Sequence, residues 1–185
     1  LSTAERNTAV GGGSGNSITT GDDNVIAGFA AVAQGNPSKS VVLGDSAMFN
    51  QGLSNKLWVE NSPGSTPLLS GDFTTNMVGV NVTSAAPTST FQVVGSQSSS
   101  ILSIVANTTL DATHSTVIIP LGSAFTVTLP SASGITGRIY RIVNKTAGSI
   151  TIGSYVNLAG STITTLGTGT SILVQSDGTN WQQIQ

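Results

Sequence analysis

The side chains that could perform acid–base or hydrolytic chemistry are few, and most lie in predicted turns. The chain has eight acidic residues, and Asp22–Asp23 is the one adjacent pair among them. Hydrolysis of a glycosidic bond needs two carboxyl groups roughly 5–10 Å apart. Turn aspartates ordinarily accept hydrogen bonds from their own backbone. We therefore expect structural acids and no enzymatic activity, with carboxylates shared between subunits as the open alternative.

The single histidine, His114, excludes a site made of several imidazoles within one chain. Three copies of His114 on a threefold axis could hold a metal, although a lone histidine in a polar stretch is ordinarily solvated. The chain has no cysteine, which removes thiolate ligands. We expect no cofactor and no metal, with His114 kept as a candidate only for a threefold site.

Sugar recognition is the other chemistry that these residues could support. It requires an aromatic ring to stack on a pyranose face and nearby amides or carboxylates for the hydroxyl groups. The candidate receptor-binding residues are Trp181 with Asn180 and Asp177, and Tyr155 with Asn157. Trp181 begins a predicted strand, which favours a place in the core or an interface. Tyr155 lies in a turn-rich stretch and is expected to be exposed.

The elements that must position these residues are predicted to be strands. Only 8% of the residues are charged, 5% are aromatic and 22 are glycine, while Val, Ile and Leu occur in short runs bounded by turn residues. A net charge of -2 provides no positive field for phosphates, which excludes nucleic-acid binding as an expectation. No apolar run approaches the roughly 18 residues that span a bilayer, so we expect no membrane insertion.

The first region, residues 7–49, contains short apolar steps that each end in glycine. Gly21, Gly28 and Gly35 are spaced by seven residues. A short strand followed by a glycine with positive φ is typical of a β-coil that turns and advances. Because one thin coil would leave an apolar stripe in water, three chains around an axis would merge their stripes. The repeat therefore predicts a homotrimer. The steps are Thr8–Gly11, Ser17–Gly21, Asn24–Gly28, Ala31–Gly35 and Ser40–Gly44.

These steps resemble the head repeats of trimeric autotransporter adhesins, whose β-rolls use a related glycine-ended unit. The second region, residues 55–94, has a different texture of short strands separated by Pro, Gly and Asn turns. It is similar to a module of bacteriophage tail fibres. The resemblance rests on Lys56–Asn61, Thr66–Leu68 and Gly71–Phe73.

The third region, residues 100–185, has turn signals about every 8–12 residues, which is typical of a β-sandwich. Asp177-Gly178 predicts a tight turn that returns the last strand antiparallel. This region resembles the tip domains of phage tail fibres, on Thr128–Pro130, Arg138–Tyr140 and Ser176–Trp181. The expected strands are Ile101–Val105, Thr116–Ile119, Phe125–Leu129, Arg138–Val143, Ser149–Ile152, Ser171–Gln175 and Trp181–Ile184.

The sequence thus predicts an all-β, elongated homotrimeric fibre with three parts. These are a Gly-punctuated β-roll over 1–54, a short-strand shaft or connector over 55–99 and a β-sandwich tip over 100–185. Loops at one end of a rigid sandwich suit recognition, and we expect them at 131–137 and 153–161.

The resemblance implies a structural and receptor-binding tail-fibre fragment that attaches a phage or phage-like particle to a bacterial cell. Its partners would be itself as a homotrimer, a surface polysaccharide or outer-membrane receptor, and the remaining fibre and baseplate. The location would be a virion tail or an extracellular particle surface. The alternatives are the head of a bacterial trimeric surface adhesin, on the bacterial cell surface, and a purely structural fibre spacer.

Overall fold

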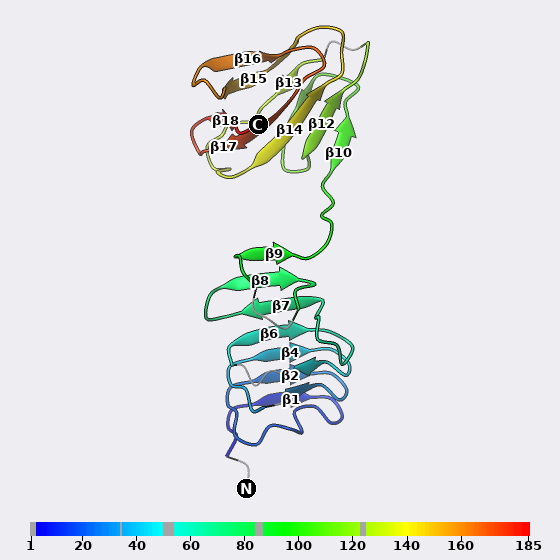
Figure 1. Cartoon of the computed structure of the whole chain (residues 1–185), viewed down its shortest axis with the longest axis vertical. Coiled ribbons are helices and arrows are strands. Elements are labelled where there is room, and N and C mark those ends of the chain that lie inside the picture. The colour runs from blue at the N-terminus through cyan, green and yellow to red at the C-terminus, as the bar shows by residue number, and fades with distance from the viewer. Residues whose placement is uncertain (1–2, 34, 50–53, 84–86, 123–124) are drawn as a thin grey trace. The chain divides into compact units, whose positions relative to one another are not determined.

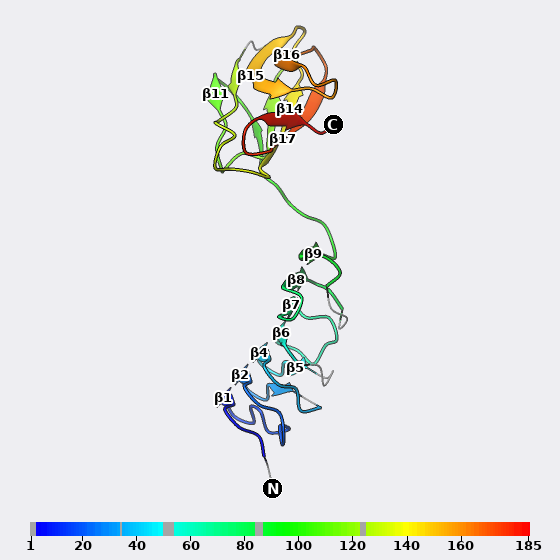
Figure 2. The same ribbon diagram turned by 90° about the vertical axis from the view of Figure 1, so that its left-hand side faces the viewer.

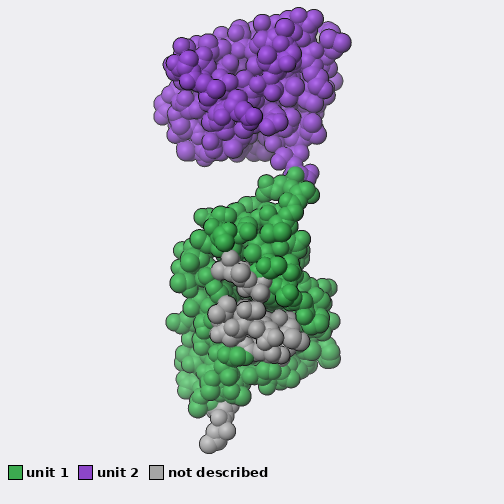
Figure 3. All heavy atoms as spheres, viewed as in Figure 1, with its two compact units in different colours: residues 1–97 green, residues 98–185 purple. Residues whose placement is uncertain are grey.

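The computed structural model describes residues 3–33, 35–49, 54–83, 87–122 and 125–185. Within these ranges every regular element is a β-strand and no helix occurs, which confirms the all-β prediction. The chain divides into two compact units, the N-terminal unit of residues 1–97 and the C-terminal unit Ser98–Gln185 (Figure 3). The division lies within two residues of the predicted 99/100 boundary. The predicted 54/55 boundary separates no compact units.

Most strands of the N-terminal unit belong to one sheet, in the order β1-β2-β4-β6-β7-β8-β9, and β3 pairs separately with β5 (Figure 1). The first four strands are parallel, whereas β7 and β8 follow antiparallel and β9 is parallel to β8. The strands are β1 (Thr8–Val10), β2 (Val25–Ala27), β3 (Val32–Ala33), β4 (Val41–Leu43), β5 (Met48–Phe49), β6 (Lys56–Val59), β7 (Leu69–Asp72), β8 (Met77–Val80) and β9 (Phe91–Val93).

The parallel strands form a coil in which each turn takes 16 or 17 residues. Thr8, Val25, Val41 and Leu57 are successive partners across the sheet. Strands β3 and β5 repeat at the same interval on the other side of the coil (Figure 2). The predicted β-coil is therefore present, but the seven-residue spacing of its glycines is not the repeat. The predicted strand at residues 17–20 is a bend, because this stretch closes the turn between β1 and β2.

The core of the coil is one side chain thick. Ile26, Val42 and Trp58 point inward from successive parallel strands and are at most 4% exposed. Ala31 and Ala47 face them, and both are fully buried. Each of the described core positions thus contributes one inward side chain per strand or corner of the coil.

The C-terminal unit is one curved, nine-stranded sheet around its own core. Strands β10, β12 and β14 form one parallel ladder, and β11, β13 and β15 form another. β14 pairs antiparallel with β17, β17 with β18 and β15 with β16, and the parallel pairing of β15 with β18 joins the two ladders into one sheet. The strands are β10 (Ile101–Ser103), β11 (Thr108–Thr109), β12 (Thr116–Ile119), β13 (Val127–Thr128), β14 (Ile139–Asn144), β15 (Ile150–Val156), β16 (Thr162–Leu166), β17 (Ser171–Ser176) and β18 (Trp181–Gln183).

This unit differs from the expected sandwich in its parallel ladders and in two strands, β11 and β16, that the sequence pattern did not indicate. The predicted hairpin is confirmed: β17 and β18 pair antiparallel, and the amide of Asp177 donates to the carbonyl of Asn180 at 3.0 Å. Gly178 takes a φ of 95°, which favours glycine in this turn.

Among the described residues, the core of the C-terminal unit contains sixteen buried apolar residues and that of the coil contains five. At its centre the rings of Tyr140 and Trp181 lie 5.0 Å apart. The indole of Trp181 donates to the carbonyl of Pro130 at 2.7 Å. This unit therefore contains enough buried surface to define a core within a single chain.

Candidate functional site

The acidic residues of the coil hold the structure together. Arg6 donates to Asp23 at 2.6 Å, and Lys56 donates to Asp72 at 2.6 Å. These bonds lower the pKa of both carboxyl groups below their ordinary value. Because a general acid at neutral pH needs a raised pKa, this arrangement is unsuited to that role.

Glu60 and Asp177 each organise a turn. Glu60 accepts from the amides of Asn61 at 2.8 Å and Leu68 at 3.0 Å, and these bonds, with one from a serine hydroxyl, lower its pKa. Asp177 accepts from the amides of Asn180 and Thr179, both at 2.7 Å, which lowers its pKa. Both carboxylates therefore act as turn caps.

His114 lies beside Asp111 in the turn between β11 and β12. Its Nδ1 atom is 2.7 Å from the Asp111 carboxylate, and its side chain is 13% exposed. Hydrogen bonds from Thr113, together with the one from His114, lower the pKa of Asp111 to about 2. No group of three or more possible metal ligands occurs among the described residues of one chain. The threefold metal site at His114 stays a prediction.

Both aromatic candidates for sugar stacking are buried. Trp181 is 3% exposed and Tyr155 is 6% exposed, and the Tyr155 hydroxyl donates to the carbonyl of Thr165 at 3.3 Å. The expectation that Tyr155 is exposed is wrong, because β15 continues through it to Val156. Burial also raises the pKa of Tyr155. Neither ring presents a face on which a sugar could stack.

The polar candidates lie in two separate turns of the C-terminal unit. Asn157 accepts from the amides of Ala159 at 3.0 Å and Ser161 at 2.8 Å, so its side chain closes the loop between β15 and β16. Asn180 is exposed in the β17–β18 turn that Asp177 caps. The structure thus gives Asn157 and Asp177 loop-closing hydrogen bonds, and a role of these residues or of the exposed Asn180 in recognition stays a prediction.

A different surface stands out: the outer face of the seven-stranded sheet in the N-terminal unit. Side chains that alternate with the inward Ile26, Val42 and Trp58 form two columns across all seven strands. Every member except Thr8 and Gly71 has an apolar side chain. We call this surface the outer face. Its columns are Thr8, Val25, Val41, Leu57, Gly71, Val78, Phe91 and Val10, Ala27, Leu43, Val59, Leu69, Val80, Val93.

Several members of the outer face are strongly exposed in the single chain. Val10 is 62% exposed, Phe91 is 59% and Val25 is 42%. A sheet with one solvated face ordinarily alternates apolar inward with polar outward residues. Here the outward positions are apolar, although the inward positions Ile26, Val42 and Trp58 already form the core. A contiguous apolar surface of this kind is typical of an interaction site. Sequence reasoning anticipated an apolar stripe but did not name its residues.

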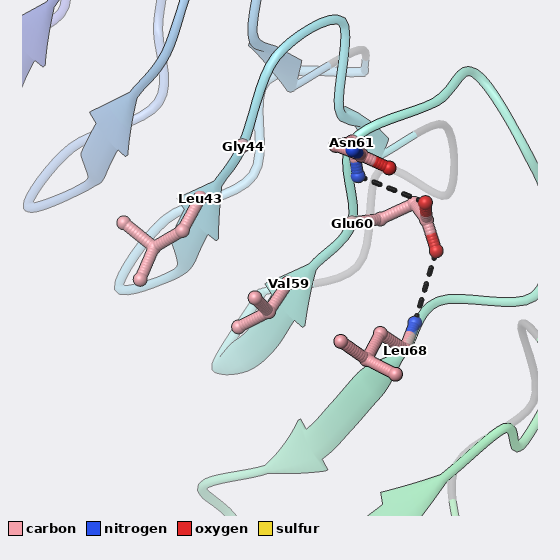
Figure 4. Close-up of a pocket in the computed structure, with 6 residues that line it drawn as sticks. All are labelled: Leu43, Gly44, Val59, Glu60, Asn61 and Leu68. Carbon is pink, nitrogen blue, oxygen red and sulfur yellow. Dashed lines mark hydrogen bonds between the residues drawn. The ribbon is translucent and has the colours of Figure 1, made fainter.

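The outer face contains a hollow of about 350 Å³ near the end of the coil (Figure 4). Leu43, Val59 and Leu68 project on the same side of the strands and line it, whereas the Glu60 side chain turns away toward the loop. The hydrogen bond from the Leu68 amide to Glu60 fixes the loop that carries Leu68. The hollow is an apolar recess with room for a side chain of a partner.

Polar ladders between turns of the coil keep the outer face in register. The Asn7 side chain accepts from the Asn24 amide at 2.9 Å, Asn24 accepts from the Ser40 amide at 3.0 Å, and Ser40 accepts from the Lys56 amide at 3.2 Å. Each bond joins one turn of the coil to the next. A second ladder of the same kind passes through Glu5, Asp22, Ser38 and Ser54.

Comparison with protein-family models, curated proteins and solved structures finds no match to this chain. Among the described residues no helix is long and apolar enough to cross a membrane. The outer face is the most extensive exposed apolar surface described above for the N-terminal unit.

Proposed function

We propose that this chain is a non-enzymatic segment of a homotrimeric fibre of the phage tail-fibre kind, which assembles through its outer face and takes part in attachment to a bacterial surface. The observation that carries the proposal is a sheet whose outward side chains are almost all apolar across its seven strands, while Ile26, Val42 and Trp58 are buried on its other side. Covering this face removes exposed apolar surface from water, which is the main driving force for association.

A second copy of the same chain fits this face better than an unrelated surface. Neighbouring strands of a sheet lie about 4.8 Å apart, so the columns of the outer face repeat with that spacing. A second copy with a parallel axis has the same spacing along its whole length, and its side chains can interdigitate at every strand. No charged residue belongs to either column, so two copies can meet without burying a charge.

The number of copies and the attachment role rest on the sequence resemblances. Tail fibres and trimeric adhesins share thin β-coils whose cores merge in threes, and the coil here has a core one side chain thick. The engagement of most acids in ion pairs and turn caps supports a role without catalysis. Exposed loop residues such as Asn180 are available for a bacterial surface glycan. Three identical tips would bind repeated glycans with avidity.

Light scattering on the intact chain tests the assembly. One chain has a mass of 18.6 kDa, and we expect a particle of about three times that mass. Val25→Asp places a charge in the outer face, so we expect the particle to fall to the mass of one chain because burying an unpaired charge is costly. Circular dichroism should report the same strand content for both proteins.

Leu158→Asp is the matched control, because Leu158 is 72% exposed in a loop outside the outer face. Its particle mass should equal that of the unmodified chain. A monomeric unmodified chain at micromolar concentration would overturn the proposal. An oligomeric Val25→Asp variant would show that the chain does not assemble through the outer face. A particle with the mass of two chains would show that the assembly is a dimer and would overturn the proposed trimer.

A further inference from the structure

We propose that the C-terminal units of neighbouring copies also pack on one another, through the outward side of strands β10, β12, β14 and β17. This inference rests on the proposed assembly of the N-terminal units and adds a second, separate interface to it. We call this surface the tip face. It consists of Ile101, Ser103, Thr116, Ile118, Ile139, Arg141, Val143, Ser171, Leu173 and Gln175.

The tip face carries apolar side chains although it points away from the core. Five of its ten members are apolar: Ile101 is 68% exposed and Ile139 is 43% exposed, whereas Ile118, Val143 and Leu173 are half-buried. The other five members are polar, and the alternate residues of the same strands, such as Val117 and Ile142, are completely buried in the core. Exposed apolar side chains with polar residues around them are typical of an interaction surface.

Strand β10 adds a second observation, since it forms an open edge of its sheet. It stands at the end of the strand order, and all three of its residues are exposed. Edge strands of monomeric proteins are ordinarily protected by charged side chains, proline or bulges. Residues 98–105 contain no charged residue and no proline, and Val105 is 86% exposed. This edge lacks the protection that a free edge needs.

Chain connectivity selects a second copy as the partner. Residues 94–100 connect β9 to β10, and seven extended residues reach at most about 25 Å. Once the N-terminal units have assembled, each β10 is confined near the β10 strands of the other copies. Tethering of this kind gives effective concentrations on the order of millimolar. A modest apolar face is then sufficient for packing, and a free partner would have to compete with the tethered copies.

Arg141 indicates which part of the tip face forms the contact. It is exposed on β14, and it belongs to no ion pair among the described residues. Arg141 also lines a small polar recess with Ser171 and Gln185. Because like charges from several copies repel, Arg141 must stay in water. The contact is therefore centred on β10 and β12, around Ile101 and Ile118, with Arg141 at the rim.

Hydrogen exchange measured by mass spectrometry tests the tip face in the full chain. Peptides over residues 100–105 should exchange about tenfold more slowly in the assembled protein than in the Val25→Asp monomer, whose β10 sequence is unchanged. Ile118→Asp should keep the assembled mass, through the N-terminal units, and lose this protection. Trp181 fluorescence checks that the C-terminal unit remains folded, and Ile101→Asp is the second variant if Ile118→Asp unfolds.

Leu158→Asp should keep both the assembled mass and the protection of β10, because Leu158 lies outside both faces. An assembled protein whose β10 exchanges as fast as in the Val25→Asp monomer would overturn the tip face and leave the proposed function intact. Retained protection in the folded Ile118→Asp and Ile101→Asp variants would also overturn it. A monomeric unmodified chain would instead overturn the proposed function, and the tip face with it.

Discussion

The two units of this protein begin with the same kind of strand pairing, but different interactions hold their strands together. Each starts with strands that belong to two parallel ladders, and in each the sheet then continues through antiparallel pairs, β6–β7–β8 in the N-terminal unit and β14–β17–β18 in the C-terminal unit. In the coil the sheet partners recur at 16 or 17 residues, whereas in the C-terminal unit Thr116 follows its partner Ile101 by 15 residues and Arg141 follows Thr116 by 25. The longer crossings supply side chains for a larger core.

In the thin coil, hydrogen bonds and backbone contacts between successive turns take the place of a large apolar core. The described part of the coil has five buried core residues, and hydrogen-bonded ladders and closely stacked glycines specify how its turns superimpose. The C-terminal unit has sixteen, with Tyr140 against Trp181 at the centre. A regular repeat and an apolar outer face suit assembly with copies, whereas an irregular unit with its own core suits a terminal domain.

The largest expected effect breaks the glycine stack of the coil. Gly28 has a φ of 138°, and a side chain there would collide with the backbone of Gly44 in the next turn. Because neither backbone can move without separating the turns, Gly28→Ala should cost about 4 kcal/mol or more and unfold the coil. Loss of strand signal by circular dichroism and rapid hydrogen exchange of residues 25–43 would report it, with the C-terminal unit unaffected.

Gly95→Ala is the matched control for Gly28→Ala, because it introduces the backbone strain of a positive φ without a collision with a neighbouring turn. Gly95 has nearly the same φ, 137°, but open space surrounds the position of its absent side chain. We expect Gly95→Ala to cost only about 1 kcal/mol, from the conformation alone. Equal destabilisation by the two variants would show that close stacking does not specify the coil.

Local patterns in the sequence were sufficient to predict strands and turns, but not which strands pair. The β17–β18 hairpin was predictable because Asp177-Gly178 defines the turn between neighbouring strands. The coil pairs residues 16 or 17 apart, and its true repeat appears only when Gly11, Gly28 and Gly44 are aligned. Gly21 and Gly35 lie in other corners of the coil, which makes the seven-residue spacing incidental.

The candidate site failed at Tyr155 for a specific physical reason. Strict alternation from the buried Ile150 and Ile152 would place Tyr155 outward, but the pairing of β15 with β16 shifts register between Thr151 and Tyr155. Such a bulge changes which face the following residue occupies. Gly153 lies in it because a side chain there would meet Leu129. The glycine was visible in the sequence, whereas the change of face that it allows was not.

Asn24 in the coil and Asn144 in the C-terminal unit are two buried asparagines, each 1% exposed. Asn24 joins three turns of the coil, and its loss would leave the Ser40 amide without its partner, so Asn24→Ala should cost about 2–3 kcal/mol. Asn144 instead bonds to the nearby loop carbonyls of Leu166 and Gly167. Asn144→Ala should cost a similar amount in urea unfolding.

The two asparagine variants should differ in how many residues lose protection from hydrogen exchange. The Asn24 ladder spans the coil, whereas the contacts of Asn144 lie at one end of the C-terminal unit. Hydrogen exchange should accelerate over all of residues 8–59 in Asn24→Ala, but only over residues 144–170 in Asn144→Ala. Acceleration confined to residues 22–40 in Asn24→Ala would contradict the view that the ladders hold the coil as one body.

The last expected effect is gradual and concerns acid. The bond from Lys56 lowers the pKa of Asp72 below its ordinary value of 3.8, and this pair joins the last turn of the coil to β7. A carboxyl group with a depressed pKa in the fold contributes stability that is present above pH 3.8 and is lost as the pH falls through the folded value. The urea midpoint of the coil should therefore fall as the pH is lowered from about 5.

Asp72→Asn should cost about 1.5–3 kcal/mol at neutral pH, the range for hydrogen bonds to charged groups, and should flatten this acid dependence. The C-terminal unit provides the internal comparison, because Asp111 has a pKa of about 2 and loses its contribution at lower pH. Parallel acid profiles of the unmodified chain and Asp72→Asn would show that the ion pair does not couple the coil to its antiparallel end. A flattened profile confined to the coil would place the acid-sensitive junction at β6–β7, where the repeat stops and the chain changes to antiparallel pairing.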